Sequence, residues 1–269
     1  MARTRRPKLG QHFLSSAGYR QRIVEALALR PDDLVVEIGP GRGAVTELVA
    51  ERARRVVAIE LDGSLARQLE EKVKDQPAIE ILQGDILSTD LAALCRRHQA
   101  ERCYVFGNLP YYLTSPIIHH LMNSAGWIRG MALLVQREVA ERLTAAPGSR
   151  DYGYLTVLAQ LHSQPRMVLN VPPGAFSPPP KVQSALVDFT MRPKFPAWSA
   201  HERARFLAFV KLCFAQKRKN LLNNLRKAYS GDSIDAAFRT LGISSRLRAE
   251  ELDLDRFASL FAGLVSASG

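Results

Sequence analysis

Residues 34–44 read LVVEIGPGRGA, an aliphatic run that leads into a turn rich in glycine. The run Leu34–Ile38 predicts a buried strand, and the residues after the turn predict a helix that continues to about Glu51. Glycines between a strand and a helix let the backbone approach a ligand, because no Cβ atom stands in the way. We therefore expect a ligand site at this turn, although a purely structural glycine turn would leave the same pattern.

Similar aliphatic runs recur along the chain and alternate with helical patterns such as Ser64–Lys74 and Ser88–His98. This alternation predicts an α/β fold whose sheet is mostly parallel and carries helices on both faces. A proline-rich loop joins the last two runs, which predicts an antiparallel strand at one edge of the sheet. The expected strands are Leu34–Ile38, Val56–Glu60, Ile79–Gln83, Tyr104–Phe106, Met131–Val135, Met167–Val171 and Ser184–Met191.

The alternation ends near residues 192–196, which read RPKFP. Helical patterns alone follow, and Gly231 and Gly242 are expected to cap them. The expected helices are His201–Phe214, Lys217–Tyr229, Ser233–Leu241 and Asp253–Val265. We therefore expect an α/β domain over residues 1–194 and a small all-helical domain over residues 195–269.

The 269 residues have an ordinary globular composition, with 46% hydrophobic and 23% charged residues, and a net charge of +11. The excess lies at the two ends: residues 1–30 hold seven basic residues and one acid, and residues 201–269 hold 12 basic and seven acidic residues. Basic ends around a neutral middle suggest a polyanionic partner, although they would also simply aid solubility. The arginine-rich start lacks the apolar core of a secretory signal, so we expect a basic arm on a cytoplasmic protein.

Cysteine, histidine and apolar patterns exclude several classes. The three cysteines are far apart without a C-x-x-C pair, which argues against a disulfide scaffold and a zinc ribbon and fits a reducing compartment. The six histidines show no metal-binding spacing, so we expect no metal. No apolar run approaches the about 18 residues that span a bilayer, so we expect no membrane partner.

The glycine turn fits two ligand templates. As G-x-G-x-x-G/A it would hold a dinucleotide pyrophosphate, and with Glu37 included it resembles the first motif of S-adenosylmethionine-dependent methyltransferases. Both templates place an acid at the end of the next strand, so Glu60 does not discriminate between them. Asp85, after the third strand, is able to accept a hydrogen bond from an adenine amine, but aspartate is common in such loops.

The fourth strand runs into GNLPYY, residues 107–112, the most specific signal in the chain. In an open α/β sheet this loop would lie beside the glycine turn. The Asn108 side-chain carbonyl and a backbone carbonyl next to Pro110 would accept both hydrogens of an adenine N6, and Tyr111 offers a ring on which an extruded base would stack. Such acceptors favour a pyramidal nitrogen attacking a sulfonium methyl, and hydride transfer has no evident use for them. The alternative is a proline turn with two core tyrosines.

Together, these residues and others resemble the small-subunit ribosomal RNA adenine N6,N6-dimethyltransferases of the KsgA/RsmA type, from Lys8 to about Leu225. Some members of that family carry Asn where this chain has His12. The motifs that carry the resemblance are QHFL (11–14), EIGPGRG (37–43), Glu60, Gly84-Asp85, NLPYY (108–112), FSPPPKVQS (176–184), FAQKRK (214–219) and NNL (223–225).

The resemblance implies a Rossmann-like class I methyltransferase domain that uses S-adenosylmethionine. It implies that His12 and Leu14 border the cofactor and that Gly39 and Gly41 approach it. Glu60 would bind the ribose of the cofactor and Asp85 its adenine. In the catalytic loop, Asn108 and the Leu109 carbonyl beside Pro110 would hold the target N6, and Tyr111 and Phe176 would sandwich the base. Asn108 would also contact the cofactor.

The resemblance also implies a substrate, two adjacent adenosines in the 3′-terminal hairpin of small-subunit rRNA, and a role in small-subunit biogenesis. The expected partner is that rRNA or the assembling small subunit, and we expect a monomer, although the sequence does not fix the oligomeric state. Phosphates would contact basic residues on one helical stretch, unless these only form a solvated face: Lys217, Arg218, Lys219, Arg226 and Lys227. The alternatives are a large-subunit rRNA methyltransferase, an NAD-type oxidoreductase and an RNA-binding assembly factor without catalysis.

Overall fold

The computed structural model describes residues 12–216 and 219–266, which form two compact units. The first unit contains the described residues up to Ala140 together with Gln164–Met191. The second contains Glu141–Ser163 and the described residues from Arg192 onward. The sequence places residues 141–163 with the first domain, but in the structure their helix α7 (Tyr154–His162) contacts α8 (Ala200–Cys213) and α11 (Leu254–Ser266). The expected division of roles between the two parts stays a prediction.

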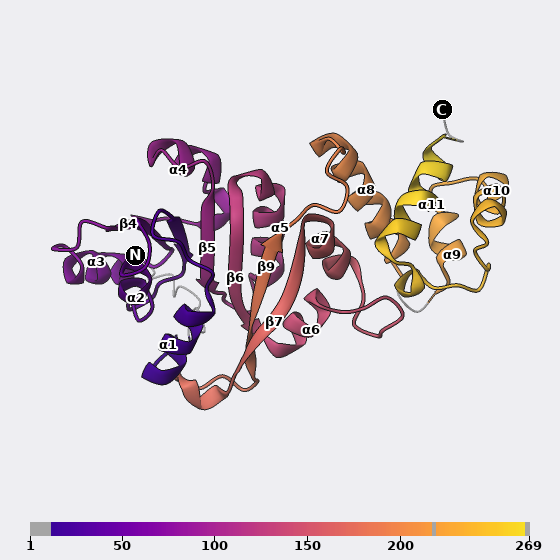
Figure 1. Cartoon of the computed structure of the whole chain (residues 1–269). Helices are drawn as coiled ribbons and strands as arrows, with labels where there is room; N and C mark the ends of the chain where they lie inside the picture. Colours follow the sequence, from indigo (N-terminus) through magenta and orange to yellow (C-terminus); the bar gives the residue numbers. More distant parts are fainter. Residues whose placement is uncertain (1–11, 217–218, 267–269) are drawn as a thin grey trace, which may run out of the picture. The chain divides into compact units, whose positions relative to one another are not determined.

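A seven-stranded sheet dominates the first unit, with strand order β4-β3-β2-β5-β6-β9-β7 (Figure 1). Neighbouring strands from β4 to β6 are parallel, and β9 is antiparallel to β6. This confirms the mostly parallel sheet with an antiparallel strand toward one edge. The strands of this sheet are β2 (Leu34–Ile38), β3 (Arg55–Glu60), β4 (Ile79–Gln83), β5 (Cys103–Asn108), β6 (Ile128–Gln136), β7 (Ser163–Val171) and β9 (Ser184–Met191).

Two very short strands, β1 (Phe13–Leu14) and β8 (Phe176–Ser177), form a second, antiparallel sheet. Phe13 pairs with Ser177 and Leu14 with Phe176, so segments more than 160 residues apart lie side by side. Neither strand was expected from the sequence. This pairing brings the start of the described chain to the proline-rich loop before β9.

The helices follow the sequence closely, with one clear difference. The expected helix Lys217–Tyr229 begins outside the described residues and is wrong over residues 219–229, where α9 spans only Leu221–Leu225, because Asn220 caps its start and the chain turns after Leu225. Gly242 ends α10 in a left-handed conformation as expected, whereas Gly231 is the first residue of α10 and Ser230 caps it. The other helices are α1 (Ala17–Ala26), α2 (Thr46–Ala50), α3 (Gly63–Lys72), α4 (Leu91–Arg97), α5 (Thr114–Asn123), α6 (Arg137–Leu143) and α10 (Gly231–Leu241). In the described part of the chain, no helix has the length and apolarity to cross a membrane.

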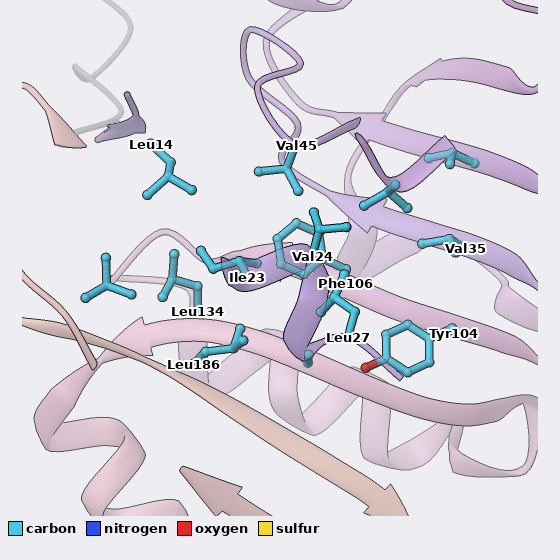
Figure 2. Packing of buried hydrophobic residues seen from close by; sticks show 14 of the residues in the cluster. Leu14, Ile23, Val24, Leu27, Val35, Val45, Tyr104, Phe106, Leu134 and Leu186 are labelled. Carbon is cyan, nitrogen blue, oxygen red and sulfur yellow. The ribbon is translucent and has the colours of Figure 1, made fainter. Parts of the chain in front are cut away.

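One face of the sheet is covered by α1 and α2. All five residues of β2 are buried, as expected for a central strand with helices on both faces. Figure 2 shows Ile23 and Val24 of α1, together with Leu27 just after the helix, packed over side chains of the sheet. The sheet residues in this cluster include Val35, Val56, Ala58, Tyr104, Phe106, Ala132, Leu134 and Leu186. This packing fixes the strands whose carboxyl ends carry the candidate site.

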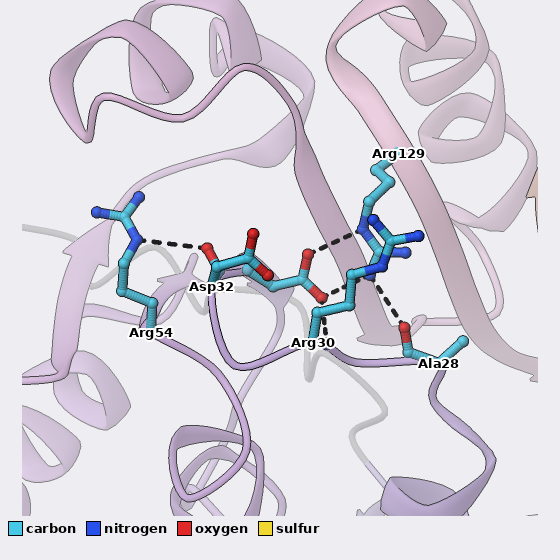
Figure 3. Close-up of polar contacts among 6 residues, drawn as sticks. Ala28, Arg30, Asp32, Arg54 and Arg129 are labelled. Carbon is cyan, nitrogen blue, oxygen red and sulfur yellow. Dashed lines mark hydrogen bonds and ion pairs between the residues drawn. The ribbon is translucent and has the colours of Figure 1, made fainter.

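A partly buried ion pair lies at the other end of the sheet, where the parallel strands begin. Arg129, near the start of β6, donates from Nε to Oδ1 of Asp33 at 2.8 Å and from Nη2 to Oδ2 of the same carboxylate. It also donates to the Ala28 carbonyl at 3.0 Å (Figure 3). Because Asp33 is only 6% exposed, this pair gives the buried carboxylate a charged partner in addition to the Arg30 N–H, which donates to Oδ2 at 2.7 Å.

Candidate active site

The candidate site lies at the carboxyl ends of β2, β3 and β5. In the sheet, Ile38 pairs with both Ile59 and Gly107, so the residues that follow them meet at one edge. A pocket opens at this edge within the first unit. Its lining contains every residue that the sequence predicts for the site: His12, Leu14, Gly39, Gly41, Glu60, Asp85, Asn108, Leu109, Pro110, Tyr111 and Phe176. The structure thus brings these residues together, and their individual roles stay predictions.

The glycine turn depends on its glycines for both conformation and space. Gly39 and Gly41 have φ values of +65° and +58°, which residues that carry a side chain rarely adopt. A Cβ atom on Gly41 would lie 2.9 Å from two ring carbons of Phe13 in β1. The Arg42 guanidinium also lies 4.9 Å from the centre of that ring. The short strand β1 therefore packs directly on the turn.

Two carboxylates shape the walls of the pocket. Glu60 is buried, and its Oε2 and Oε1 accept hydrogen bonds from the backbone N–H groups of Gly41 at 3.0 Å and Asp62 at 2.9 Å. Asp85 accepts from the Leu87 N–H at 2.9 Å and begins a short 3₁₀ turn, Ile86–Ser88. Each carboxylate oxygen has a second lone pair, so these contacts leave acceptor capacity for a ligand.

Glu37 is a third acid in the pocket lining, and the sequence identifies it only as part of a motif. It is 3% exposed, and no hydrogen bond from the described residues reaches its Oε2. Burial raises the pKa of Glu37 from 4.5 to about 7; the neighbouring Thr46 hydroxyl works against this rise, and the Glu60 carboxylate adds to it. A carboxyl with a free buried oxygen suits a cationic ligand, which would favour its ionised form.

Glu37→Gln is expected to remove a pH dependence of stability. Between pH 4.5 and about 7 the folded protein keeps the Glu37 proton, whereas the unfolded chain has released it. The contribution of Glu37 to the free energy of unfolding therefore falls as the pH rises through this window, by about 3 kcal/mol in total. Chemical denaturation of both proteins at a series of pH values would measure this contribution as the difference between the wild type and the variant, and a difference that does not change with pH would contradict it.

The end of β5 and the loop after it present two hydrogen-bond acceptors that have no partner among the described residues. The Asn108 Nδ2 group donates to the His12 carbonyl at 3.1 Å, which turns Oδ1 away from that contact. The Pro110 carbonyl is occupied, because it accepts from the Leu113 N–H at 3.0 Å and the Thr114 hydroxyl at 3.1 Å. Within residues 12–216 and 219–266, no hydrogen bond reaches Asn108 Oδ1 or the Leu109 carbonyl. These two oxygens are the acceptors that the loop offers to a ligand.

Aromatic rings border the same part of the pocket. The Tyr111 hydroxyl lies 3.3 Å from the Ser184 hydroxyl, and its ring centre is 5.8 Å from that of His12. Phe176 is 4% exposed and belongs to β8. Both Tyr111 and Phe176 line the pocket, and a base held between their rings stays a prediction.

The described members of the basic set expected to bind phosphate do not lie within one helix. Lys217 and Arg218 lie outside the described residues. Lys219 precedes the cap of α9, whereas Arg226 and Lys227 follow its last turn. In the part of the chain that the structure describes, no cluster of His, Cys, Asp and Glu side chains is suited to a metal ion.

Comparison with known proteins identifies the family to which this chain belongs. A family model described as "Ribosomal RNA adenine dimethylase" matches residues 2–265, nearly the whole chain. The chain belongs to this family. A relative from Acidobacterium capsulatum, named ribosomal RNA small subunit methyltransferase A, is 47% identical over 264 residues, which are 98% of this chain and 92% of that protein.

Two solved structures of similar proteins agree with the fold of this dimethylase family member. The 23S rRNA methyltransferase ErmE is 30% identical with a TM-score of 0.71, covering 94% of this chain and 99% of ErmE. A dimethyladenosine transferase from Plasmodium falciparum has a TM-score of 0.80 at 23% identity, covering 96% of this chain and 98% of the other. The second likeness supports the fold alone. Together they confirm the methyltransferase-type α/β architecture that the sequence predicts.

Proposed function

We propose that this chain uses S-adenosylmethionine to dimethylate N6 of two adjacent adenosines in the 3′-terminal hairpin of small-subunit rRNA. One observation carries the chemistry: the Asn108 amide is held by its nitrogen, so that its oxygen and the Leu109 carbonyl are left as acceptors in the pocket. Two acceptors match the two hydrogens of an adenine amine. Membership of the adenine dimethylase family supports the same substrate group.

The residues of the pocket fit the proposed cofactor. It is a cation that carries an adenosine. Gly39 and Gly41 offer backbone without side chains, and Glu37 offers a buried oxygen to which none of the described residues donates a hydrogen bond. Glu60 would bind the ribose and Asp85 the adenine, with Leu14 at the border. When bound, the cofactor supplies a methyl group made electrophilic by its sulfonium. The additional buried carboxyl group of Glu37 suits this positive charge better than it would suit a dinucleotide pyrophosphate, which is anionic.

The chain itself would mainly orient the adenine amine. Its lone pair is delocalised into the ring, and acceptance of both N–H groups by Asn108 Oδ1 and the Leu109 carbonyl favours a pyramidal nitrogen. Stacking on Tyr111, with Phe176 on the other side, would hold the extruded base in line with the methyl group. No strong base is needed, because the amine proton becomes acidic once the nitrogen has gained a methyl group, and it is then released to water.

The small subunit is favoured over the large subunit as the source of the substrate. Relatives named ribosomal RNA small subunit methyltransferase A are 47%, 41% and 39% identical to this chain over more than 90% of its length, whereas ErmE, a 23S rRNA methyltransferase, is 30% identical. We therefore assign the rRNA or the assembling small subunit as the partner. With this partner we also propose a cytoplasmic location and a role in subunit biogenesis, in which the basic residues of the chain would contact phosphates.

Methylation of purified subunits tests this function. Small and large subunits from cells that lack the corresponding gene would be incubated with the protein and S-adenosylmethionine, and the digested rRNA analysed by mass spectrometry. We expect N6,N6-dimethyladenosine in two adjacent positions of the small-subunit RNA alone. Dimethylation confined to the large-subunit RNA, or tighter binding of NAD than of S-adenosylmethionine, would contradict the proposal.

A further inference from the structure

A side-chain amide is useful as an acceptor only when its oxygen faces the ligand. Rotation of the Asn108 amide by half a turn would exchange Oδ1 and Nδ2 and would present N–H donors where an adenine amine also has donors. The orientation must therefore be set by a neighbouring group. In the structure that group is the main-chain carbonyl of His12, which accepts a hydrogen bond from Nδ2 at 3.1 Å. If the amide were flipped, Oδ1 would face this carbonyl, and two acceptors form no hydrogen bond with each other.

The position of this carbonyl is in turn fixed by the His12 ring. Its Nδ1 lies 2.7 Å from the Pro178 carbonyl, and because a carbonyl only accepts, Nδ1 carries the hydrogen. Immediately after these contacts, Phe13 pairs with Ser177 and Leu14 with Phe176. The His12 ring also lies beside Tyr111 in the catalytic loop. The imidazole thus connects the residue before β1 to the proline loop, next to the first residue pair of the two strands.

We propose that His12 is a positioning residue for methyl transfer: its imidazole, bound to the Pro178 carbonyl, holds its own main-chain carbonyl against Asn108 and so sets which end of the amide faces the adenine. The proposal rests on the proposed function for its catalytic consequence. It differs from the role that the family resemblance implies, in which His12 borders the cofactor. The two roles separate in kinetics, because positioning affects kcat and a cofactor contact affects cofactor affinity.

The atom used by His12 suggests a matched pair of variants. The nitrogen of an Asn side chain stands at the same number of bonds from the backbone as His Nδ1, whereas the nitrogen of Gln stands one bond further out, like His Nε2. His12→Asn should therefore keep the bond to Pro178, and His12→Gln should lose it. His12→Ala removes the group altogether and should behave like His12→Gln.

The kinetic test compares these variants with the wild type on small-subunit RNA. His12→Gln and His12→Ala lose the hydrogen bond that favours one orientation of the Asn108 amide. We therefore expect kcat to fall by about 5- to 10-fold in both variants, with the cofactor Kd unchanged. His12→Asn should stay within about twofold of the wild type in both. If all three variants lose cofactor affinity while kcat is preserved, or if all three match the wild type, the proposal is wrong.

A second measurement on the ligand-free protein does not depend on activity. The side-chain amide NMR signal of Asn108, assigned by its absence in Asn108→Ala, should exchange slowly with water in the wild type and in His12→Asn. It should exchange faster in His12→Gln and His12→Ala, with melting temperatures confirming that both are folded. Equal exchange in all four proteins would overturn the proposal, even if the substrate proved to be another RNA. Conversely, a protein inactive on rRNA that shows the expected exchange pattern would refute the proposed function and keep the positioning role of His12.

Discussion

Asn108→Ala is expected to lower kcat for adenine methylation by about 10²- to 10³-fold, the usual cost of removing one preorganised hydrogen-bonding group at a reacting centre. The variant loses one of the two acceptors in the loop, and the Leu109 carbonyl alone is unable to hold both hydrogens of the amine. The walls of the cofactor site belong mainly to other segments, so the Kd for S-adenosylmethionine should change little. Single-turnover methylation and calorimetric titration would measure the two quantities.

Asn123→Ala is the matched control for this prediction. Asn123 is the last residue of α5, is exposed and does not line the pocket, so the same chemical change is made on the surface of the same unit. We expect wild-type kinetics from it. If Asn108→Ala turned over as fast as this control, the loop would not bind the amine.

Arg129→Ala is expected to cause the largest loss of stability, about 3–5 kcal/mol in the free energy of unfolding. The substitution leaves the Asp33 carboxylate buried with only the Arg30 N–H, at 2.7 Å, as a recorded hydrogen-bond donor among the described residues (Figure 3). The pair lies where the strands begin, at the end of the sheet opposite the pocket. The folded fraction of the Arg129→Ala protein should therefore bind the cofactor normally. Urea denaturation of the purified protein would measure the loss.

Arg102→Ala provides the comparison for this loss. Arg102 contacts Glu101 at 3.3 Å, and the side chains are 49% and 87% exposed. Ion pairs exposed to this extent contribute about 0–1 kcal/mol. A loss for Arg129→Ala no greater than for Arg102→Ala would show that water or a shifted neighbour compensates Asp33.

The sequence predicts the sheet and the site well where local patterns determine them. The aliphatic run before Gly39 is the strand β2 with the predicted bounds, and the parallel register alone places the residues after β2, β3 and β5 at one edge. The signals at Gly39, Glu60 and Asn108 are therefore sufficient to locate the pocket. Local order along the chain is enough here, because neighbouring parallel strands always end at the same edge.

What the sequence does not predict depends on contacts between distant segments. Strands of two residues, such as β1 and β8, leave no periodic pattern, so the link between His12 and Pro178 has no local signal. The raised pKa of Glu37 results from burial, which a motif does not reveal. The residues after Lys217 form a helical pattern in the sequence, but the Asn220 side chain caps α9, so that this helix begins at Leu221.

A crystal structure of the protein with S-adenosylhomocysteine and a short RNA that carries the target adenosine tests the central claim most directly. The account predicts an extruded adenine on Tyr111, with its N6 within hydrogen-bonding distance of Asn108 Oδ1 and the Leu109 carbonyl, and with Asn108 Nδ2 still bound to the His12 carbonyl. An adenine bound elsewhere, or an Asn108 side chain turned away from N6 while both ligands are present, would contradict it.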